Sequence, residues 1–289
     1  MISNSEYKKF CILLAEEAGK FVMNYFDKDF EVFSKDRKNN LVTEVDKGCQ
    51  DLIKNRIYKR FPDHNIIGEE DDSSEIRNAS EFVWVIDPID GTTNFANGLP
   101  NFSISIALLK NSEPIAGSIW IPWPNEKKCL IFSTAKDGGS WIDNSKISIK
   151  KSHFSIGEGA ISSYSSFSPI FGNKDRKIKP MNKRLRGDKR VIGSVAYEMA
   201  MLAKGVVSLA LLGPAFIWDF GAGLLLIKEA GGIVLELDNN YEPKAEFNSF
   251  LNGNYQRDQE TFTKLRNWTG KFIAGNPDIM KLNNHGKFV

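Results

Sequence analysis

The chain has 289 residues, of which 42% are hydrophobic and 26% are charged, and its formal net charge at pH 7 is +2. This composition excludes a disordered or fibrous protein, and the balanced charge gives no reason to expect nucleic acid as an obligatory partner. The 3 cysteines lack close spacing, which indicates a reducing, cytoplasmic compartment and argues against a disulfide framework or a zinc site. The first residues lack the apolar core of a signal peptide, and no apolar run approaches the roughly 20 residues of a membrane span.

The first part of the chain has the pattern of two amphipathic helices. Apolar side chains recur at helical spacing from residue 5 to residue 26, and again from Asp46 to Phe61, where Pro62 ends the pattern. The segment between the two helices, residues 34–40, is polar. Asp46 falls at the start of the second helix, and its spacing alone favours a role as the N-cap.

An acidic run follows a short predicted strand at Ile66 and Ile67. The run reads Gly68-Glu69-Glu70-Asp71-Asp72, and its adjacent carboxylates repel one another. Spacing alone therefore favours a solvated loop. Its position at the end of a strand keeps a ligand role open.

The stretch from Trp84 to Pro100 begins with a buried strand and two carboxylates three positions apart. Residues 82–86 are apolar and β-favouring, and we expect Asp87-Pro88 to stop the strand. Asp87 and Asp90 are then placed to share one hard divalent cation, which the Ile89 carbonyl can join as an oxygen ligand. Asp-Pro or Asp-Gly alone would more often be a simple turn.

A phosphate site is predicted directly after these carboxylates. Gly91 lets a phosphate approach the main chain, and Thr92 or Thr93 can cap a following helix. The free amides at the start of that helix would bind an anion. A cation site and a phosphate site are therefore expected side by side.

The remainder of the chain divides into two patterns. Alternation and evenly spaced turns from Phe102 to Lys150 predict an antiparallel meander, whereas helices and strands alternate after about residue 155. An α/β sandwich is the expected fold, with an N-terminal α+β half over residues 1–153 and a C-terminal α/β half over residues 154–289. Nine basic and two acidic residues crowd residues 174–190, which indicates a solvated surface or, alternatively, an anion-binding surface.

Several of these motifs resemble those of the inositol monophosphatase family, which consists of magnesium-dependent phosphomonoesterases. The resemblance is carried by Asp87-Pro-Ile-Asp-Gly-Thr-Thr-Asn-Phe95, by Gly68-Glu69-Glu70, and by Trp218-Asp-Phe-Gly-Ala-Gly223 with Glu229-Ala-Gly-Gly232. Residues 272–277 resemble the last strand of the family and lead to its closing helix. The resemblance runs from about residue 46 to residue 282 and implies a layered α-β-α-β-α sandwich of the sugar-phosphatase type.

The resemblance also implies a role for each matching residue. It implies Mg²⁺ as the cofactor, inhibition by lithium, and a set of metal ligands formed by Glu69, Asp87, Asp90, Asp219 and the Ile89 carbonyl. Thr92, oriented by Asp46, would position the attacking water, with Glu70 behind it. The amides of Gly91 and Thr92 would hold the phosphate, while Asp90 and main-chain groups near Ser194 and Val195 could hold a polyol. No Cys or His is placed to act as a nucleophile, so direct attack by water is expected.

One position departs from the family pattern. Inositol-selective members place a glutamate seven residues before the metal-binding aspartate, and this chain has Leu212 there. Leucine cannot accept a hydrogen bond from a substrate hydroxyl, so a more apolar or differently shaped leaving-group pocket is predicted. The following Gly213-Pro214 resembles a loop of some nucleotide-bisphosphate phosphatases.

The leading prediction is therefore a Mg²⁺-dependent phosphatase of inositol monophosphate or of a similar polyol or sugar phosphate. Three alternatives use the same chemistry on phosphoadenosine phosphate, histidinol phosphate or fructose bisphosphate. A regulator that binds nucleic acid or another macromolecule on the same fold is a further alternative, and a calcium-binding structural protein lacks any EF-hand spacing. The expected partner is a small phosphorylated metabolite, without a membrane or nucleic acid, and a homodimer is compatible with the sequence.

Overall fold

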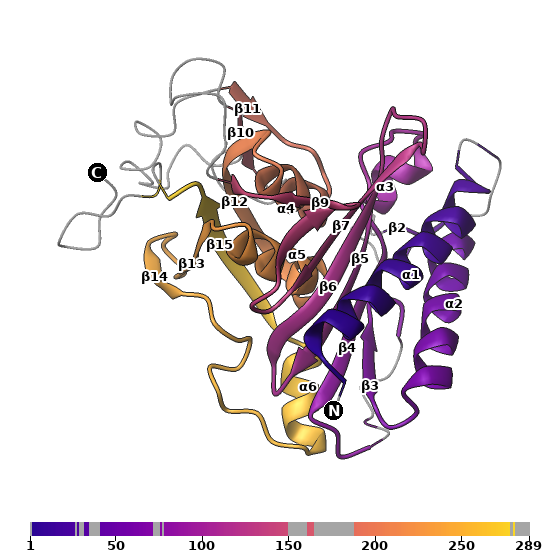
Figure 1. The fold of residues 1–289 in the computed structure, drawn as a ribbon, viewed down its shortest axis with the longest axis vertical. Helices are drawn as coiled ribbons and strands as arrows, with labels where there is room; N and C mark the ends of the chain where they lie inside the picture. The colour runs from indigo at the N-terminus through magenta and orange to yellow at the C-terminus, as the bar shows by residue number, and fades with distance from the viewer. Residues whose placement is uncertain are drawn as a thin grey trace.

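The computed structural model describes residues 2–26, 28, 32–34, 41–71, 76, 78–149, 161–164, 188–277 and 280. Two β-sheets lie in layers with helices between and outside them (Figure 1). The first sheet has seven strands, namely β3 (Asn65–Gly68), β4 (Phe82–Asp90), β5 (Ser103–Lys110), β6 (Glu113–Pro122), β7 (Cys129–Ala135), β8 (Gly139–Ile142) and β9 (Ser145–Ile147). Only the β3–β4 pair of this sheet is parallel, and from β4 to β9 each strand pairs antiparallel with the next, which confirms the predicted meander.

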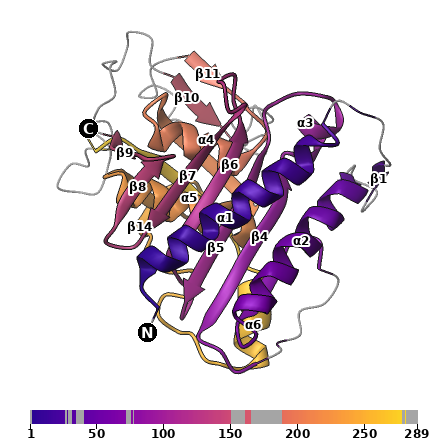
Figure 2. The same ribbon diagram turned by 45° about the vertical axis from the view of Figure 1, so that its right-hand side comes forward.

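Two long helices cover one face of this sheet (Figure 2). They are α1 (Asn4–Met23) and α2 (Glu44–Arg60), and both confirm the predicted amphipathic helices. Their buried side chains, such as Leu14 and Ile53, form one core with Trp84, Ile86 and Ile104 of the sheet. The two short strands β1 (Val32–Ser34) and β2 (Leu41–Thr43) form a separate antiparallel pair, and β2 leads directly into α2.

Strand β4, the second strand from one edge of the first sheet, runs past Asp87-Pro88 to Asp90, so the prediction that this pair stops the strand is wrong. The physical reason is a bulge, because Asp87 pairs with Ser105 and Asp90 with Ser103, which leaves one extra residue on β4. The neighbouring strand β3 pairs only as far as Ile86, so Pro88 removes no ladder hydrogen bond on that side. The bulge places both carboxylates at the end of a rigid, buried strand.

The second sheet has mixed pairing and lies behind a layer of two helices. Its strand order is β11-β10-β12-β15-β13-β14, with parallel pairs only among β10, β11 and β12. Helices α4 (Val195–Ala203) and α5 (Ile217–Glu229) contact strands of both sheets and share one core with them. The strands are β10 (Ile161–Tyr164), β11 (Asp188–Arg190), β12 (Val207–Phe216), β13 (Ile233–Leu237), β14 (Pro243–Glu246) and β15 (Thr269–Gly275).

The last described helix, α6 (Gln259–Arg266), buries Phe262 and Leu265 in the same core as the middle helices. On the outer face of the second sheet, Leu209, Leu211 and Ile273 pack with Met280. The predicted closing helix, the boundary between residues 153 and 154 and most of the basic stretch 174–190 lie outside the described residues. Among the described helices, none combines the length and the apolar character needed to cross a bilayer.

A buried histidine lies beneath α1. His64 stacks between Phe61, at 4.8 Å between ring centroids, and Phe82, at 4.6 Å. Its Nδ1 accepts a hydrogen bond of 3.0 Å from Trp84 Nε1, so the imidazole must be unprotonated at that nitrogen. Burial lowers the pKa of His64 to about 4, which Asp63 only partly offsets.

The His64 environment predicts a loss of stability in mild acid. Between pH 6.5 and about 4 the unfolded chain binds a proton that the folded chain does not, so stability falls as the pH falls through this window. The loss should reach at most about 3 kcal/mol at the lower end. We expect His64→Gln, which keeps an acceptor for Trp84, to flatten the difference in urea unfolding free energy between pH 7 and pH 4.5. An unchanged slope in this variant would contradict the assignment.

Candidate active site

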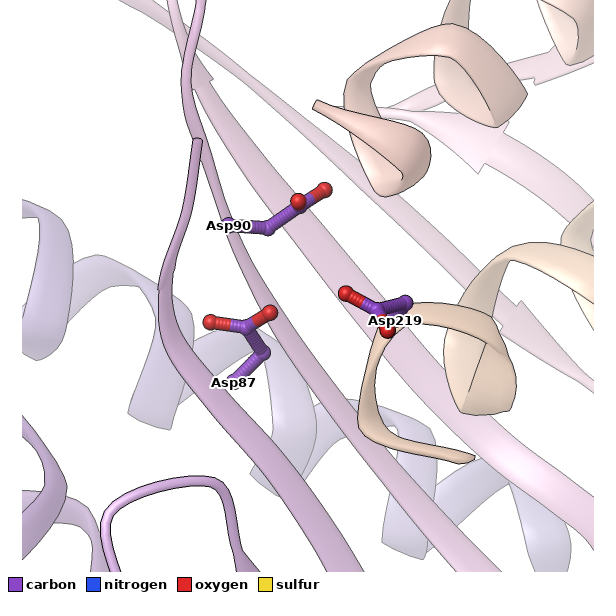
Figure 3. Close-up of side chains that lie close together, drawn as sticks. All are labelled: Asp87, Asp90 and Asp219. Carbon is purple, nitrogen blue, oxygen red and sulfur yellow. The ribbon is translucent and has the colours of Figure 1, made fainter. Parts of the chain in front are cut away.

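Three aspartates bring their carboxylates together where β4 ends and α5 begins (Figure 3). Asp87 and Asp90 come from the bulged end of β4, and Asp219 comes from the first turn of α5. One oxygen of each carboxylate lies within 4.8 Å of the others. Two elements that are 129 positions apart, counting from Asp90 to Asp219, therefore build one acidic cluster.

Hydrogen bonds fix Asp90 against the start of α4. Its Oδ2 accepts from Ser194 Oγ at 2.7 Å and from the Ala196 amide at 2.5 Å, and Ser103 Oγ lies 3.3 Å away. Ser194 also caps α4 by accepting from the Tyr197 amide at 3.2 Å. The groups near Ser194 and Val195 that were predicted to hold a polyol thus hold Asp90 in this structure.

Main-chain amides also orient the other two aspartates. Oδ1 of Asp87 accepts from the Ile89 amide at 3.1 Å, within the β4 bulge. Oδ2 of Asp219 accepts from the Phe216 amide at 2.6 Å, across the first turn of α5. Carboxylates whose orientation is fixed in this way are suited to bind a cation.

The electrostatics of the cluster fit a cation. Burial raises the pKa of Asp87 and of Asp219 well above the usual range, and the neighbouring carboxylates Glu69 and Asp90 raise both further. Burial also raises the pKa of Asp90 to about 6, although the hydrogen bonds from Ser194 and Ala196 work in the opposite direction. Buried carboxylates that repel one another need protons or positive charge to be stable. An all-oxygen donor set of this kind suits a hard divalent ion.

A second group of side chains lies next to the cluster and links the start of α2 to α3 (Thr92–Ala96). Thr92 Oγ1 lies 3.2 Å from Asp46 Oδ1 and 3.0 Å from the Ile89 carbonyl oxygen, and its single proton can go to either. Asp46 Oδ2 accepts from the amide of Thr43 at 2.8 Å and from its hydroxyl. The structure therefore brings Asp46 and Thr92 together, as the family resemblance implies.

The helix caps at this place differ from the predicted ones. Thr43 is the N-cap of α2, and Asp46 is the third helical residue of the same capping box, so the N-cap prediction for Asp46 is wrong. Neither Thr92 nor Thr93 caps α3, because Gly91 occupies the N-cap with a φ of 94°. A side chain at Gly91 would be strained at this φ and would meet Ser194 Cβ at 3.1 Å.

The acidic run after β3 is anchored by one of its own members. Asp71 Oδ2 accepts from the Gly68 amide at 2.9 Å, while its Oδ1 accepts from Gln50 Nε2 at 3.1 Å and pairs with Lys54. Gln50 Oε1 in turn accepts from the Glu70 amide at 2.9 Å. The run is therefore an ordered turn in its described part, and not a solvated loop. The sequence pattern gave no reason to choose Asp71 as the anchor, since its partners come from α2.

Leu212, which its spacing from Asp219 placed in the leaving-group pocket, lies in the core. Its side chain has no exposed surface and packs in the core between the two sheets, opposite Phe272. The Leu212 side chain therefore cannot contact a substrate, and a glutamate in its place would bury a charged group. A bulge between Leu212 and Ala215 turns the chain outward, so the loop instead exposes Pro214 and Phe216, the latter with 44% of its surface accessible.

Comparison with known proteins gives the family of the chain. Residues 3–269 match the inositol monophosphatase family. A fructose-1,6-bisphosphatase/inositol-1-monophosphatase of Thermotoga maritima is 34% identical over 247 residues, which are 85% of this chain and 90% of the relative. The Nus factor SuhB of Pasteurella multocida is 30% identical over 239 residues, covering 80% of this chain and 85% of SuhB. A solved Thermotoga maritima IMPase superimposes with a TM-score of 0.69 at 29% identity, covering 93% of this chain and 91% of that structure. The chain belongs to the inositol monophosphatase family.

Proposed function

We propose that this protein hydrolyses the phosphate monoester of a polyol or sugar, with inositol monophosphate as the first candidate, in a reaction that depends on Mg²⁺. The observation that carries the proposal is the cluster of Asp87, Asp90 and Asp219 beside the paired Thr92 and Asp46. Glu69 and the Ile89 carbonyl would complete the ligand set. Bound Mg²⁺ would supply positive charge that lowers the pKa of a water and stabilises the leaving alkoxide.

Each residue of the proposed site has a separate role. Thr92 Oγ1, held by Asp46, would orient the attacking water through a hydrogen bond, and Glu70 would stand behind that water as a proton acceptor. The first-turn amides of α3, at Gly91 and Thr92, would hold the phosphate oxygens. Ser194, Val195 and Ala196 would act on the substrate through Asp90, whose orientation they fix.

We propose that the rim of the leaving-group pocket is apolar. The amide of Phe216 donates to Asp219, and the side chain of Phe216 is exposed, as is Pro214. The position at which inositol-selective family members carry a glutamate is occupied by Leu212, which is buried. An unpaired substrate hydroxyl costs about 1 to 3 kcal/mol. We therefore expect a high KM for inositol monophosphate and effective competition by glycerol phosphate.

A panel of phosphate monoesters tests the proposal directly. The panel contains inositol monophosphate, glycerol 2-phosphate, fructose 1,6-bisphosphate, histidinol phosphate and phosphoadenosine phosphate, each assayed for phosphate release with Mg²⁺ and with excess EDTA. We expect release that requires Mg²⁺ and that tens of millimolar lithium inhibits. Failure to release phosphate from every member of the panel would overturn the proposal.

Two second candidates have a specific observation in their favour. The dual name of the Thermotoga relative favours fructose bisphosphate as a further substrate, and the panel includes it. The similarity to the Nus factor SuhB favours a regulator that binds a macromolecule. If the chain binds RNA through its basic stretch, retention should weaken steeply between 50 and about 200 mM salt. No retention at low salt would remove this candidate.

The free cysteines Cys11, Cys49 and Cys129 favour a cytoplasmic protein in either case.

A further inference from the structure

Arg266 ends α6 and contacts two segments that carry proposed metal ligands. Its Nη2 donates to the carbonyl oxygen of Asp71 at 3.1 Å and lies 3.4 Å from that of Glu69. Its guanidinium carbon lies 4.4 Å from the centroid of the Trp218 ring. One side chain therefore joins the turn that contains Glu69 to the residue that precedes Asp219.

Both ends of this link are fixed in the fold. Trp218 is only 6% exposed and stacks on Phe216, with ring centroids 4.5 Å apart and planes at 8°. Phe216 and the Arg266 guanidinium therefore both pack against the ring of Trp218. Phe262 and Leu265, which lie four residues and one residue before the end of α6, anchor the helix in the core.

The chemistry of the contact requires an arginine. A planar guanidinium can stack on an indole ring and donate in its own plane to two carbonyl oxygens at once, whereas a lysine ammonium is a single point charge. Burial lowers the pKa of Arg266, while Asp71, Glu69 and Glu70 act to raise it, so the cation lies among the carboxylates of the turn. Arginine remains charged under these conditions.

Several other anchors of the turn come from the first-sheet side. Asp71 binds Gly68 at the end of β3, and Gln50 and Lys54 of α2 hold Asp71 and the Glu70 amide. Asp219, by contrast, belongs to α5, which lies between the sheets. Packing of α5 on the first sheet joins the two sides, and Arg266 adds a direct contact between the Glu69 turn and the residue before Asp219.

We propose that Arg266 is a positioning residue that sets the Glu69 carboxylate relative to Asp219 and so controls the affinity for Mg²⁺. This inference rests on the proposed function, because it takes Glu69 as a metal ligand. Arg266 acts through the main chain of the turn and through Trp218, and it contacts neither the substrate nor the reacting atoms.

Calorimetric titration of the full chain with Mg²⁺ alone tests the inference without an activity readout. We expect Arg266→Ala and Arg266→Lys both to raise the Kd for Mg²⁺ by about tenfold, the range found when groups behind metal ligands are removed. Arg257→Ala is the matched control, because Arg257 pairs with Glu81 at 2.9 Å, away from the turn. Its Kd should remain within about twofold of the parent, and melting temperatures without Mg²⁺ report folding of each variant.

A double-mutant cycle identifies the path of the effect. In a Glu69→Gln background, Arg266→Lys should change the Mg²⁺ affinity by less than about twofold, because the carboxylate that it positions is gone. An equal loss in both backgrounds, or parent-like Mg²⁺ affinity of Arg266→Lys in the native background, would overturn the inference and leave the proposed function standing. Absence of Mg²⁺-dependent phosphate release by the parent protein would instead overturn the proposed function.

Discussion

Replacing Asp219 or Asp87 by Asn should lower both the affinity for Mg²⁺ and the turnover by at least about 100-fold, because a charged ligand is lost from the proposed site. Asparagine can still accept the amide hydrogen bonds that Phe216 and Ile89 donate at 2.6 and 3.1 Å, so the local geometry should persist. Activity measured against Mg²⁺ concentration gives both quantities, and Asp51→Asn, on an exposed turn of α2, is the matched control.

Thermal melting should separate this loss from unfolding. The raised pKa of Asp87 means that the folded chain holds a proton that the unfolded chain releases, so this group contributes stability at low pH that is lost as the pH rises through its folded pKa. Without Mg²⁺, Asp87→Asn should therefore melt at or above the temperature of the parent, and more clearly so at pH 8 than at pH 5. The stabilisation by added Mg²⁺ should shrink in the same variant. Parent-like activity of Asp219→Asn at limiting Mg²⁺ would contradict the ligand assignment.

Thr92→Ala should reduce kcat by about 100-fold or more and change KM much less, because the hydroxyl that orients water is lost while the main-chain amide remains. The hydroxyl lies 3.2 Å from Asp46 Oδ1. Initial rates over a range of substrate concentration at saturating Mg²⁺ give the two constants separately.

Two neighbouring variants make the Thr92 result specific. Thr92→Ser keeps a hydroxyl and should recover most of the rate, whereas Thr93→Ala alters an exposed side chain one position along α3 and should remain close to the parent. A large rise in KM at constant kcat in Thr92→Ala would assign the hydroxyl to phosphate binding instead of to water.

Short-range signals were enough to identify the elements that carry the site. Apolar spacing predicted α1 and α2, and alternation with turns predicted the meander, because local propensity and burial agree in these segments. The string from Asp87 to Thr92 also contains two of the three aspartates whose carboxylates the structure brings together.

Predictions from single positions were wrong where the side chain contacts residues distant in the sequence. Asp46 looked like an N-cap but is held by Thr43 and bonded to Thr92, and Asp71 looked solvated but is bound by Gln50 and Lys54. Spacing from Asp219 selected Leu212, yet that side chain is buried in the core, and the count of seven residues crosses a bulge in β12. Such bulges change which face a residue occupies without any strong signal in the local pattern.

The sequence by itself determined the fold class, the order of most elements and the carboxylates available for a cation, because these depend on periodicity and on residue chemistry near each position. Only the tertiary structure decided which groups meet. The β4 bulge and the first turn of α5 bring Asp87, Asp90 and Asp219 within 4.8 Å, and α6 brings Arg266 to both Trp218 and the Glu69 turn. Contacts of this kind arise from the packing of two sheets on shared helices, and no local pattern encodes the distance between elements that packing sets.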